Sequence, residues 1–218
     1  MTSAAPEFPH YTAAETAADA VIHVLGLAGA SVALGCLLAR IGSTATGTQL
    51  AALIVYGLGL VGMLSASALY NLTPPRAGRL KRVFRHLDHA MIFVMIAGSY
   101  TPVAISALPR RLGLPLCATV WSLAAIGIGL RLMWGHIYQR LSLGLHLAMG
   151  WLVLAVLPPL AVAVSGGVLA CLILGGIVYS LGSVVHTWVR VPFHNAAWHI
   201  MVIVAAALHL AAVADLLS

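Results

Sequence analysis

The stretch Arg85–Val103, RHLDHAMIFVMIAGSYTPV, indicates the fold class of this chain. It begins with basic residues and the carboxylate of Asp88, and from His89 onward it contains no Asp, Glu, Lys or Arg. A helix needs roughly 20 mainly apolar residues to cross the hydrocarbon core of a bilayer. The stretch therefore predicts a membrane-spanning helix that carries one acid close to a membrane surface.

The composition extends this interpretation to the whole chain. Of 218 residues, 61% are hydrophobic and only 7% are charged, whereas about a quarter of a typical soluble domain is charged. The formal charge of +6 is confined to short loops between apolar runs, which favours membrane lipid over nucleic acid as the partner. The three cysteines fall within apolar runs and form no CxxC pair, so we expect small packing residues rather than disulfides. No oligomeric state follows from the sequence.

Seven apolar stretches are long enough to cross a membrane. Turn-forming or charged segments such as TPPRAGRLKR and RVPFHN separate them. We therefore expect an all-α, polytopic membrane protein with a bundle of seven transmembrane helices. The expected spans are about 20–39, 49–71, 87–107, 114–133, 142–164, 168–188 and 196–216.

The two ends of the chain and its internal prolines add further expectations. Residues 1–19 hold no Lys or Arg, so we expect an amino-terminal tail without a cleavable signal, followed by the transmembrane domain over residues 20–217. Pro102 and the pair Pro158-Pro159 fall within apolar runs, where proline kinks or ends a helix.

The basic residues favour one orientation in the membrane. Lys and Arg gather in short cytoplasmic loops. With the amino terminus inside, three of the 11 cations face the other side, at Arg40, Arg110 and Arg111, and the opposite orientation would export the remaining eight. We therefore predict a cytoplasmic amino terminus. The eight cations on the predicted cytoplasmic side are Arg76, Arg79, Lys81, Arg82, Arg85, Arg131, Arg140 and Arg190.

Polar residues of three spans are expected at the same depth. Asn71 ends the second span, Asp88 begins the third and Asn195 begins the seventh, all at the predicted cytoplasmic surface. Ser67 lies one turn deeper than Asn71, and His199 one turn deeper than Asn195, because residues four apart share a helix face. An acid in an apolar helix is costly unless it faces the bundle interior or a wet cavity. We therefore predict a shared polar site near the cytoplasmic face.

Each of these residues also has a purely structural interpretation. Asp88 would be favoured by the helix dipole if it lies in the first turn of its helix. Asn71 and Asn195 would suit a helix C-cap and N-cap, and His199 would need only a hydrogen-bond partner. His23 sits alone in its apolar run, where we expect it to bond a neighbouring backbone or side chain. His86, His89 and His194 lie close to the predicted site and are reserve members of it.

The motifs SALYNL, RHLDHAMIFVMIAGSYTPV and WHIMVIVAAALHLAAV resemble the hemolysin III family. That family is related to the progestin and adipoQ receptors and more distantly to the alkaline ceramidases. The resemblance covers nearly the whole chain in length, number of spans and orientation. It implies a multi-pass protein of a cell membrane, the inner or plasma membrane of a bacterium, with a zinc ion near the cytoplasmic face in the wider superfamily.

The resemblance also implies a ligand pattern for that zinc ion. The superfamily pattern is a Ser and a His four apart on helix two, an Asp opening helix three that acts through a bound water, and H-x-x-x-H on helix seven. Ser67, Asp88 and His199 match this pattern, but Asn71 and Asn195 stand where two of the three histidine ligands are expected. An amide oxygen is a poor zinc ligand, so zinc binding should be weakened. The paired change suggests a reworked Asn–Asp–Asn–His hydrogen-bond network.

Three functions remain open at this point. A pore-forming, cytolytic or channel-like activity is what the hemolysin III resemblance implies, and we rank it first because the metal-binding residues are replaced. The first alternative is a metal-dependent intramembrane hydrolase of lipid amides, with Asp88 as proton acceptor and Ser67 as donor to the oxyanion. The second is a lipid-binding receptor without chemistry. Whether the protein is an enzyme is left undecided, and zinc is the only cofactor considered.

Overall fold

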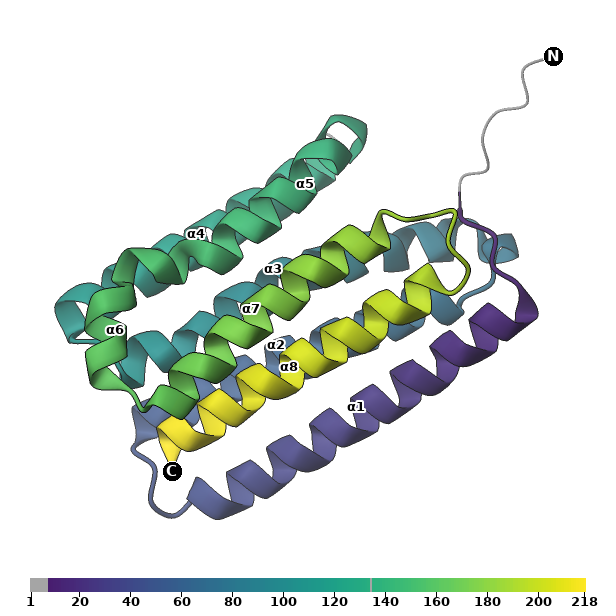
Figure 1. Ribbon diagram of the computed structural model, residues 1–218. Helices are drawn as coiled ribbons and strands as arrows, with labels where there is room; N and C mark the ends of the chain where they lie inside the picture. Colours follow the sequence, from purple (N-terminus) through teal and green to yellow (C-terminus); the bar gives the residue numbers. More distant parts are fainter. Residues whose placement is uncertain (1–7, 134) are drawn as a thin grey trace.

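The computed structural model describes residues 8–133 and 135–218, except for the side chains of residues 135–141. Within that part of the chain, the regular structure is entirely helical and includes seven helical segments long and apolar enough to cross a membrane. The expected all-α bundle is therefore confirmed (Figure 1). Its helices are α1 Ala13–Ile41, α2 Gly47–Leu72, η1 Pro75–Ala77, α3 Arg79–Ser106, α4 Arg110–Met133, α5 Gly135–Gly150, η2 Trp151–Val156, α6 Leu157–Ala163, α7 Gly166–His186 and α8 His194–Leu217.

Local sequence explains where several helices begin. Thr12 and Thr46 each form a capping box. The threonine side-chain oxygen accepts from the backbone N–H of the third residue after it, and the side chain of that residue accepts from the backbone N–H of the threonine. Ser165 caps α7 by accepting from the backbone N–H of Val168. The second, fourth, sixth and seventh spans begin within about four residues of the expected positions.

Helices α1 and α3 begin earlier than expected from the apolar runs. Helix α1 starts at Ala13 rather than near residue 20, so the last residues of the expected tail are helical. Helix α3 starts at Arg79, after Gly78 in a positive-φ conformation (φ 47°), rather than near residue 87. In both cases polar residues extend the helix beyond its apolar part.

The fifth span is interrupted, as its prolines predict. Helix α5 ends at Gly150, a 3-10 turn follows, and α6 resumes at Leu157 with Pro158 in its first turn. Proline has no N–H to continue the hydrogen-bond ladder of the preceding turn. Pro102, by contrast, lies inside the continuous helix α3.

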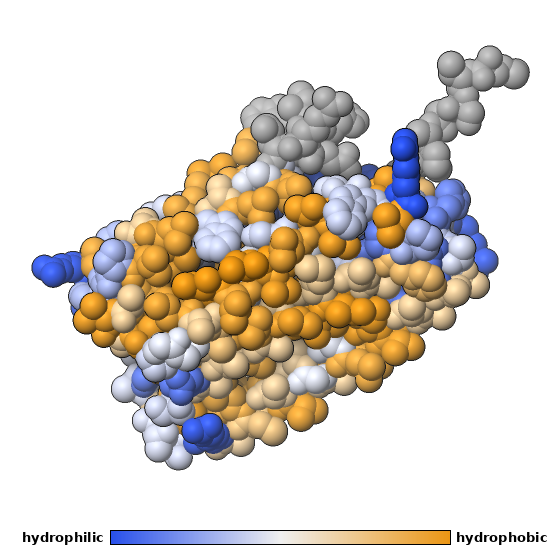
Figure 2. Space-filling view, in the orientation of Figure 1, coloured by the Kyte–Doolittle hydropathy of each residue, from blue (hydrophilic) through white to orange (hydrophobic). Residues whose placement is uncertain are grey.

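The consecutive helices α1 and α2, α2 and α3, and α7 and α8 pack antiparallel, whereas α8 lies parallel to α1 (Figure 1). Large apolar side chains such as Val24, Leu25 and Leu58 are exposed on the outer surface. Figure 2 shows a mainly apolar belt between more hydrophilic ends. Such a surface suits contact with lipid.

The segments that carry the candidate site lie at one end of the bundle. The start of α1, the segment between α2 and α3, and the segment between α7 and α8 all lie there (Figure 1). Gly26 lets α1 approach α8 closely, because a Cβ at that position would overlap the side chain of Ile203. This close approach brings the polar residues of α1 into contact with those of α8.

Candidate functional site

The carboxylate of Glu15 links the start of α1 to the start of α8. One oxygen of Glu15 accepts from the Thr12 backbone N–H, and the other accepts from the Phe193 backbone N–H at 2.9 Å. Phe193 precedes α8 in the left-handed conformation, with φ 60°. The two helices are thereby held in a register that sets Asp19, one turn after Glu15, beside His199.

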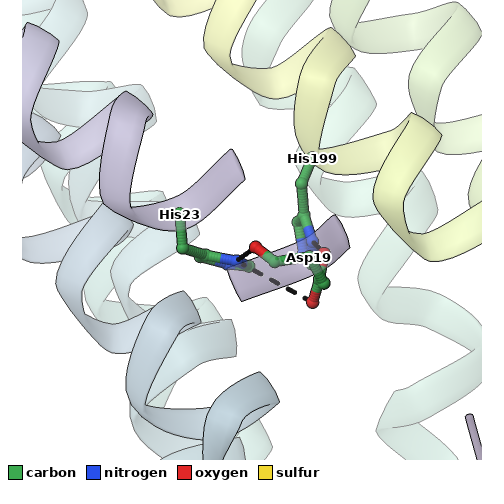
Figure 3. Close-up of side chains that lie close together, drawn as sticks. All are labelled: Asp19, His23 and His199. Atoms are coloured by element: carbon green, nitrogen blue, oxygen red, sulfur yellow. Dashed lines mark hydrogen bonds and ion pairs between the residues drawn. The ribbon is translucent and has the colours of Figure 1, made fainter. Parts of the chain in front are cut away.

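Asp19 is the centre of a buried hydrogen-bond network. Its carboxylate accepts from His199 Nδ1 at 2.5 Å and from Asn195 Nδ2 at 3.2 Å, and its backbone oxygen accepts from His23 Nδ1 at 2.8 Å. All four residues are buried. Figure 3 shows the two imidazoles on either side of Asp19. One acid thus orients both histidine rings.

Ser67 of α2 lies between the same two histidines. Its Oγ is 3.2 Å from His23 Nε2 and 3.4 Å from His199 Nε2. The two rings meet edge to face, with centroids 4.4 Å apart. The hydroxyl therefore connects α2 to α1 and α8 in the interior of the bundle.

The two asparagines join this network and do not cap helices. Asn195 Nδ2 donates to Asn71 Oδ1 at 3.2 Å, and Asn71 Nδ2 donates to the Ser67 backbone oxygen at 3.0 Å. Helix α2 runs to Leu72 with Thr73 as its C-cap, and α8 begins at His194 with Phe193 as its N-cap, so neither asparagine is a cap. The capping interpretations are wrong, because both helices extend past these residues and turn the amides inward.

Asp88 lies near the network but is not at the start of its helix. Helix α3 begins nine positions earlier, at Arg79, so stabilisation by the dipole of the first turn does not apply. The Asp88 side chain is 15% exposed and lies near Ser67 and His199. One of its oxygens is 3.7 Å from His89 Nδ1. The carboxylate therefore faces the bundle interior and not lipid.

A cavity of about 1100 Å³ opens beside the network at this end of the bundle. Asn71, Asp88, Asn195 and His199 all line it, so the structure brings these four predicted positions together. An apolar chamber of about 130 Å³ adjoins it and shares Ile92, His146, Ser183 and Trp198 with it. The rest of the chamber wall includes Met63, Met95, Tyr100, Leu147, Tyr179 and Val213.

Tyr11 lines the cavity close to the start of α1. Burial raises the pKa of the Tyr11 hydroxyl to about 12, so this group is a neutral hydrogen-bond donor near pH 7. The reserve histidines His89 and His194 also line the cavity, but the Nδ1 of each is bonded to a nearby backbone oxygen, that of Arg85 and that of Val191. Neither joins the Asp19 network directly.

The sequence interpretation missed Asp19 and His23. Asp19 falls in the expected tail, one position before the expected first span, and His23 was assigned a local bond, which it does make to Asp19 O. The available signal was the spacing of four between them, the same spacing that relates Ser67 to Asn71. The network thus contains both asparagines and His199, as expected, but its central acid is Asp19.

The amide groups at the two implied zinc-ligand positions do not fit that metal. Asn71 Oδ1 accepts from Asn195 Nδ2, and both amides act within the network as hydrogen-bonding groups. Zinc takes imidazole, thiolate or carboxylate ligands. The described residues do offer another donor set, because Asp19, His23 and His199 each have a potential ligand atom within 4.8 Å of the others'.

Comparison with known proteins agrees with these features. Residues 11–210 match the profile of a family described as haemolysin-III related. The chain is 32% identical over 194 residues to a hemolysin-3 homolog of Bacillus subtilis (strain 168), covering 88% of this chain and 90% of the relative. It is 31% identical to hemolysin-3 of Bacillus cereus over 87% of this chain and 85% of that protein. The human monocyte to macrophage differentiation factor is 30% identical over 71% of this chain and 66% of its own length.

Proposed function

The chain belongs to the haemolysin-III-related family of multi-pass membrane proteins, and on that premise we propose that it hydrolyses an acyl bond of a membrane amphiphile. The observation that carries the proposal is the cavity of about 1100 Å³, which is lined by Asp88 and His199 and adjoins an apolar chamber. A cavity with convergent titratable groups beside an apolar chamber is typical of a binding or catalytic site.

The two spaces match the two parts of an amphiphile. A polar head group would occupy the cavity, and an acyl chain would enter the chamber between Met63, Met95 and Leu147. Two buried polar atoms on the chamber wall, Tyr179 OH and His146 Nε2, have no hydrogen-bond partner among the described residues. A ligand with an amide or ester near the start of its acyl chain would supply such partners.

The chemistry requires a proton acceptor near the acyl carbon. In hydrolysis, the oxygen of a water molecule bonds to that carbon, the carbon–nitrogen or carbon–oxygen bond breaks, and the proton lost by water reaches the leaving group. We assign Asp88 as the residue that accepts and returns this proton, because it lines the cavity and is partly exposed to it. Ser67 does not line the cavity, so we assign it to positioning Asp88 and His199.

The names of the bacterial relatives suggest lysis as a second activity. A lytic pore needs a continuous polar path through the bundle. Beyond the cavity, however, the adjoining space is lined mainly by apolar side chains, and a buried apolar cluster around Tyr56, Leu60 and Met95 lies between α2, α3 and α8. These features favour a site that opens at one end over a pore.

We also propose that the end bearing the site is cytoplasmic. Arg76, Arg79 and Arg190 lie at this end, and positive residues favour the cytoplasmic side. In a cysteine-free background, Arg76→Cys should react with an impermeant maleimide only in inverted vesicles. Ser43→Cys, in the exposed segment at the other end, should react only in right-side-out vesicles. The reverse pattern would contradict the proposed orientation.

Reconstituted protein tests the proposed reaction. Vesicles carrying a fluorescent N-acyl lipid amide, or separately an ester lipid, should yield free fatty acid, and Asp88→Asn should slow this by about 10²–10⁴-fold because the proton acceptor is lost. Asp215→Asn is the matched control, since Asp215 is an exposed acid at the opposite end of α8. Dye leakage without fatty-acid release would overturn the proposal and support lysis.

A further inference from the structure

Helix α3 presents a basic, an acidic and two apolar residues in that order, starting from the end of the bundle that bears the site. Arg85 and Asp88 line the cavity, Ile92 lines both the cavity and the apolar chamber, and Met95 lines the chamber. Residues three or four apart lie on one face of a helix. At a rise of about 1.5 Å per residue, Asp88 lies about 4–5 Å beyond Arg85 along the helix axis, and Met95 about 10 Å beyond Asp88.

Arginine side chains from three parts of the chain line the cavity. Besides Arg85 on α3, they are Arg131 in the last turn of α4 and Arg190 in the segment between α7 and α8. Arg131 is only 3% exposed, so its charge is held in the wall and not in bulk solvent. Arg85 and Arg131 both lie near Tyr70, which also lines the cavity. Charges held in a protein wall act on a ligand more strongly than charges in water.

Acids do not balance these arginines among the described lining residues, where the acids are Glu15 and Asp88. Both oxygens of Glu15 accept from backbone N–H groups, one from Thr12 and the other from Phe193, so this carboxylate joins α1 to α8. Asp88 lies near Arg131, where it offsets part of the positive charge. The described part of the wall therefore has an excess of positive charge, which attracts an anion.

We propose that these arginines bind the phosphate of an anionic lipid head group, so that the cavity selects a phosphate-bearing amphiphile. As a statement about the substrate, this inference rests on the proposed function. Guanidinium groups bind phosphate through paired N–H···O bonds. Arg85 and Arg131 also interact with other groups of the protein, but a guanidinium group has five N–H donors and can serve more than one partner. Basic pockets between transmembrane helices on the cytoplasmic side are known to bind such head groups.

The order of residues along α3 matches the order of groups in a phospholipid. In such a lipid the phosphate is a few atoms from an acyl ester, and the acyl chain follows. With the phosphate at Arg85, the ester would lie beside Asp88, the proton acceptor of the proposed reaction. The acyl chain would then pass Ile92 into the chamber, toward Met95. A neutral amphiphile with the same chains lacks the phosphate contact and should bind more weakly.

Equilibrium binding of two lipids to the purified full-length protein in neutral detergent micelles tests the proposal. The probes are a fluorescent ether-linked phosphatidic acid and the dialkylglycerol with the same chains and label, which differ in the phosphate alone. Neither has an acyl bond, so binding is measured without turnover. Wild type should bind the phosphate-bearing probe at least about tenfold more tightly, and raising the ionic strength should reduce this preference. Equal affinity for the two probes would overturn the proposal.

Two substitutions test whether the phosphate binds in the cavity. Arg131→Gln should weaken binding of the ether-linked phosphatidic acid about 10–100-fold, because a charge-assisted bond is lost, and should leave dialkylglycerol binding unchanged. Arg190→Gln changes an exposed residue, so it should not affect folding, and should weaken binding about 2–5-fold. Arg110→Gln is the matched control, because Arg110 is an exposed arginine at the other end of α4. Unchanged affinity in both cavity variants, or an equal loss in Arg110→Gln, would overturn the proposal.

The source of the phosphate and the reaction are tested separately. Inorganic phosphate lacks the chains and should not displace the probe except in large excess, whereas displacement by equimolar phosphate would overturn the assignment to a lipid. Selective binding of the ether-linked phosphatidic acid without fatty-acid release from its ester form would refute only the proposed reaction. Fatty-acid release at equal rates from ester lipids with and without phosphate, unaffected by Arg131→Gln, would refute only the head-group assignment.

Discussion

Replacing Asp19 with alanine is expected to destabilise the folded protein by about 2–6 kcal/mol, because it leaves two buried hydrogen-bond donors without an acceptor and each such donor costs about 1–3 kcal/mol. The Asp19 carboxylate accepts from both His199 and Asn195 in the interior. Without it, two buried donors on α8 lose their acceptor, and α1 loses its main polar contact with that helix. Reversible unfolding in detergent micelles, followed by circular dichroism, measures the change.

Two further variants show whether the loss of stability comes from the hydrogen bonds of the Asp19 carboxylate. Asp19→Asn retains one oxygen for His199 and should lose clearly less stability than alanine. Asp215→Ala removes an exposed acid whose side chain accepts a hydrogen bond from Ser165, and should change stability by at most about 0.5 kcal/mol. If Asp19→Ala were as stable as Asp215→Ala, the carboxylate would not join α1 to α8.

Replacing Gly113 with alanine should cost about 3 kcal/mol or more, because a Cβ would overlap the backbone oxygen of Ala104. Helices α3 and α4 meet there across a short connection, and a backbone atom cannot move aside as a flexible side chain can. Gly129→Ala in the same helix is the matched control. Its Cβ would enter open space, so it should be neutral or stabilise by up to about 1 kcal/mol.

Thermal unfolding of the two alanine variants side by side separates the clash from the general effect of alanine in a helix. Equal unfolding temperatures would mean that α3 and α4 are not in contact at Gly113. A lower unfolding temperature for Gly113→Ala alone would support the close approach of the two helices.

Much of the fold was predictable because lipid imposes a simple rule. A segment in the bilayer must satisfy its backbone hydrogen bonds internally, so each long apolar run becomes a helix. The starts of α1 and α3 were less predictable. Polar residues from Ala13 and Arg79 onward extend these helices outside the apolar part, where hydropathy carries no signal.

The candidate site was predictable only in part. Asn71, Asp88, Asn195 and His199 were expected at one depth, and they do line one cavity. Asp19 and His23 were missed, because a residue at the edge of an apolar run can equally lie in a solvated tail. Their role depends on which helix α1 packs against, and periodicity within one helix does not specify its neighbours.

The sequence by itself determined that the chain forms seven membrane-spanning helices with polar residues gathered near one surface, because run length and hydropathy act locally along the chain. Only the tertiary structure decided that α1 lies against α8, with Gly26 permitting the close approach and Glu15 holding the register. That contact brings Asp19 and His23 to His199, a relation between residues about 180 positions apart that no local pattern contains.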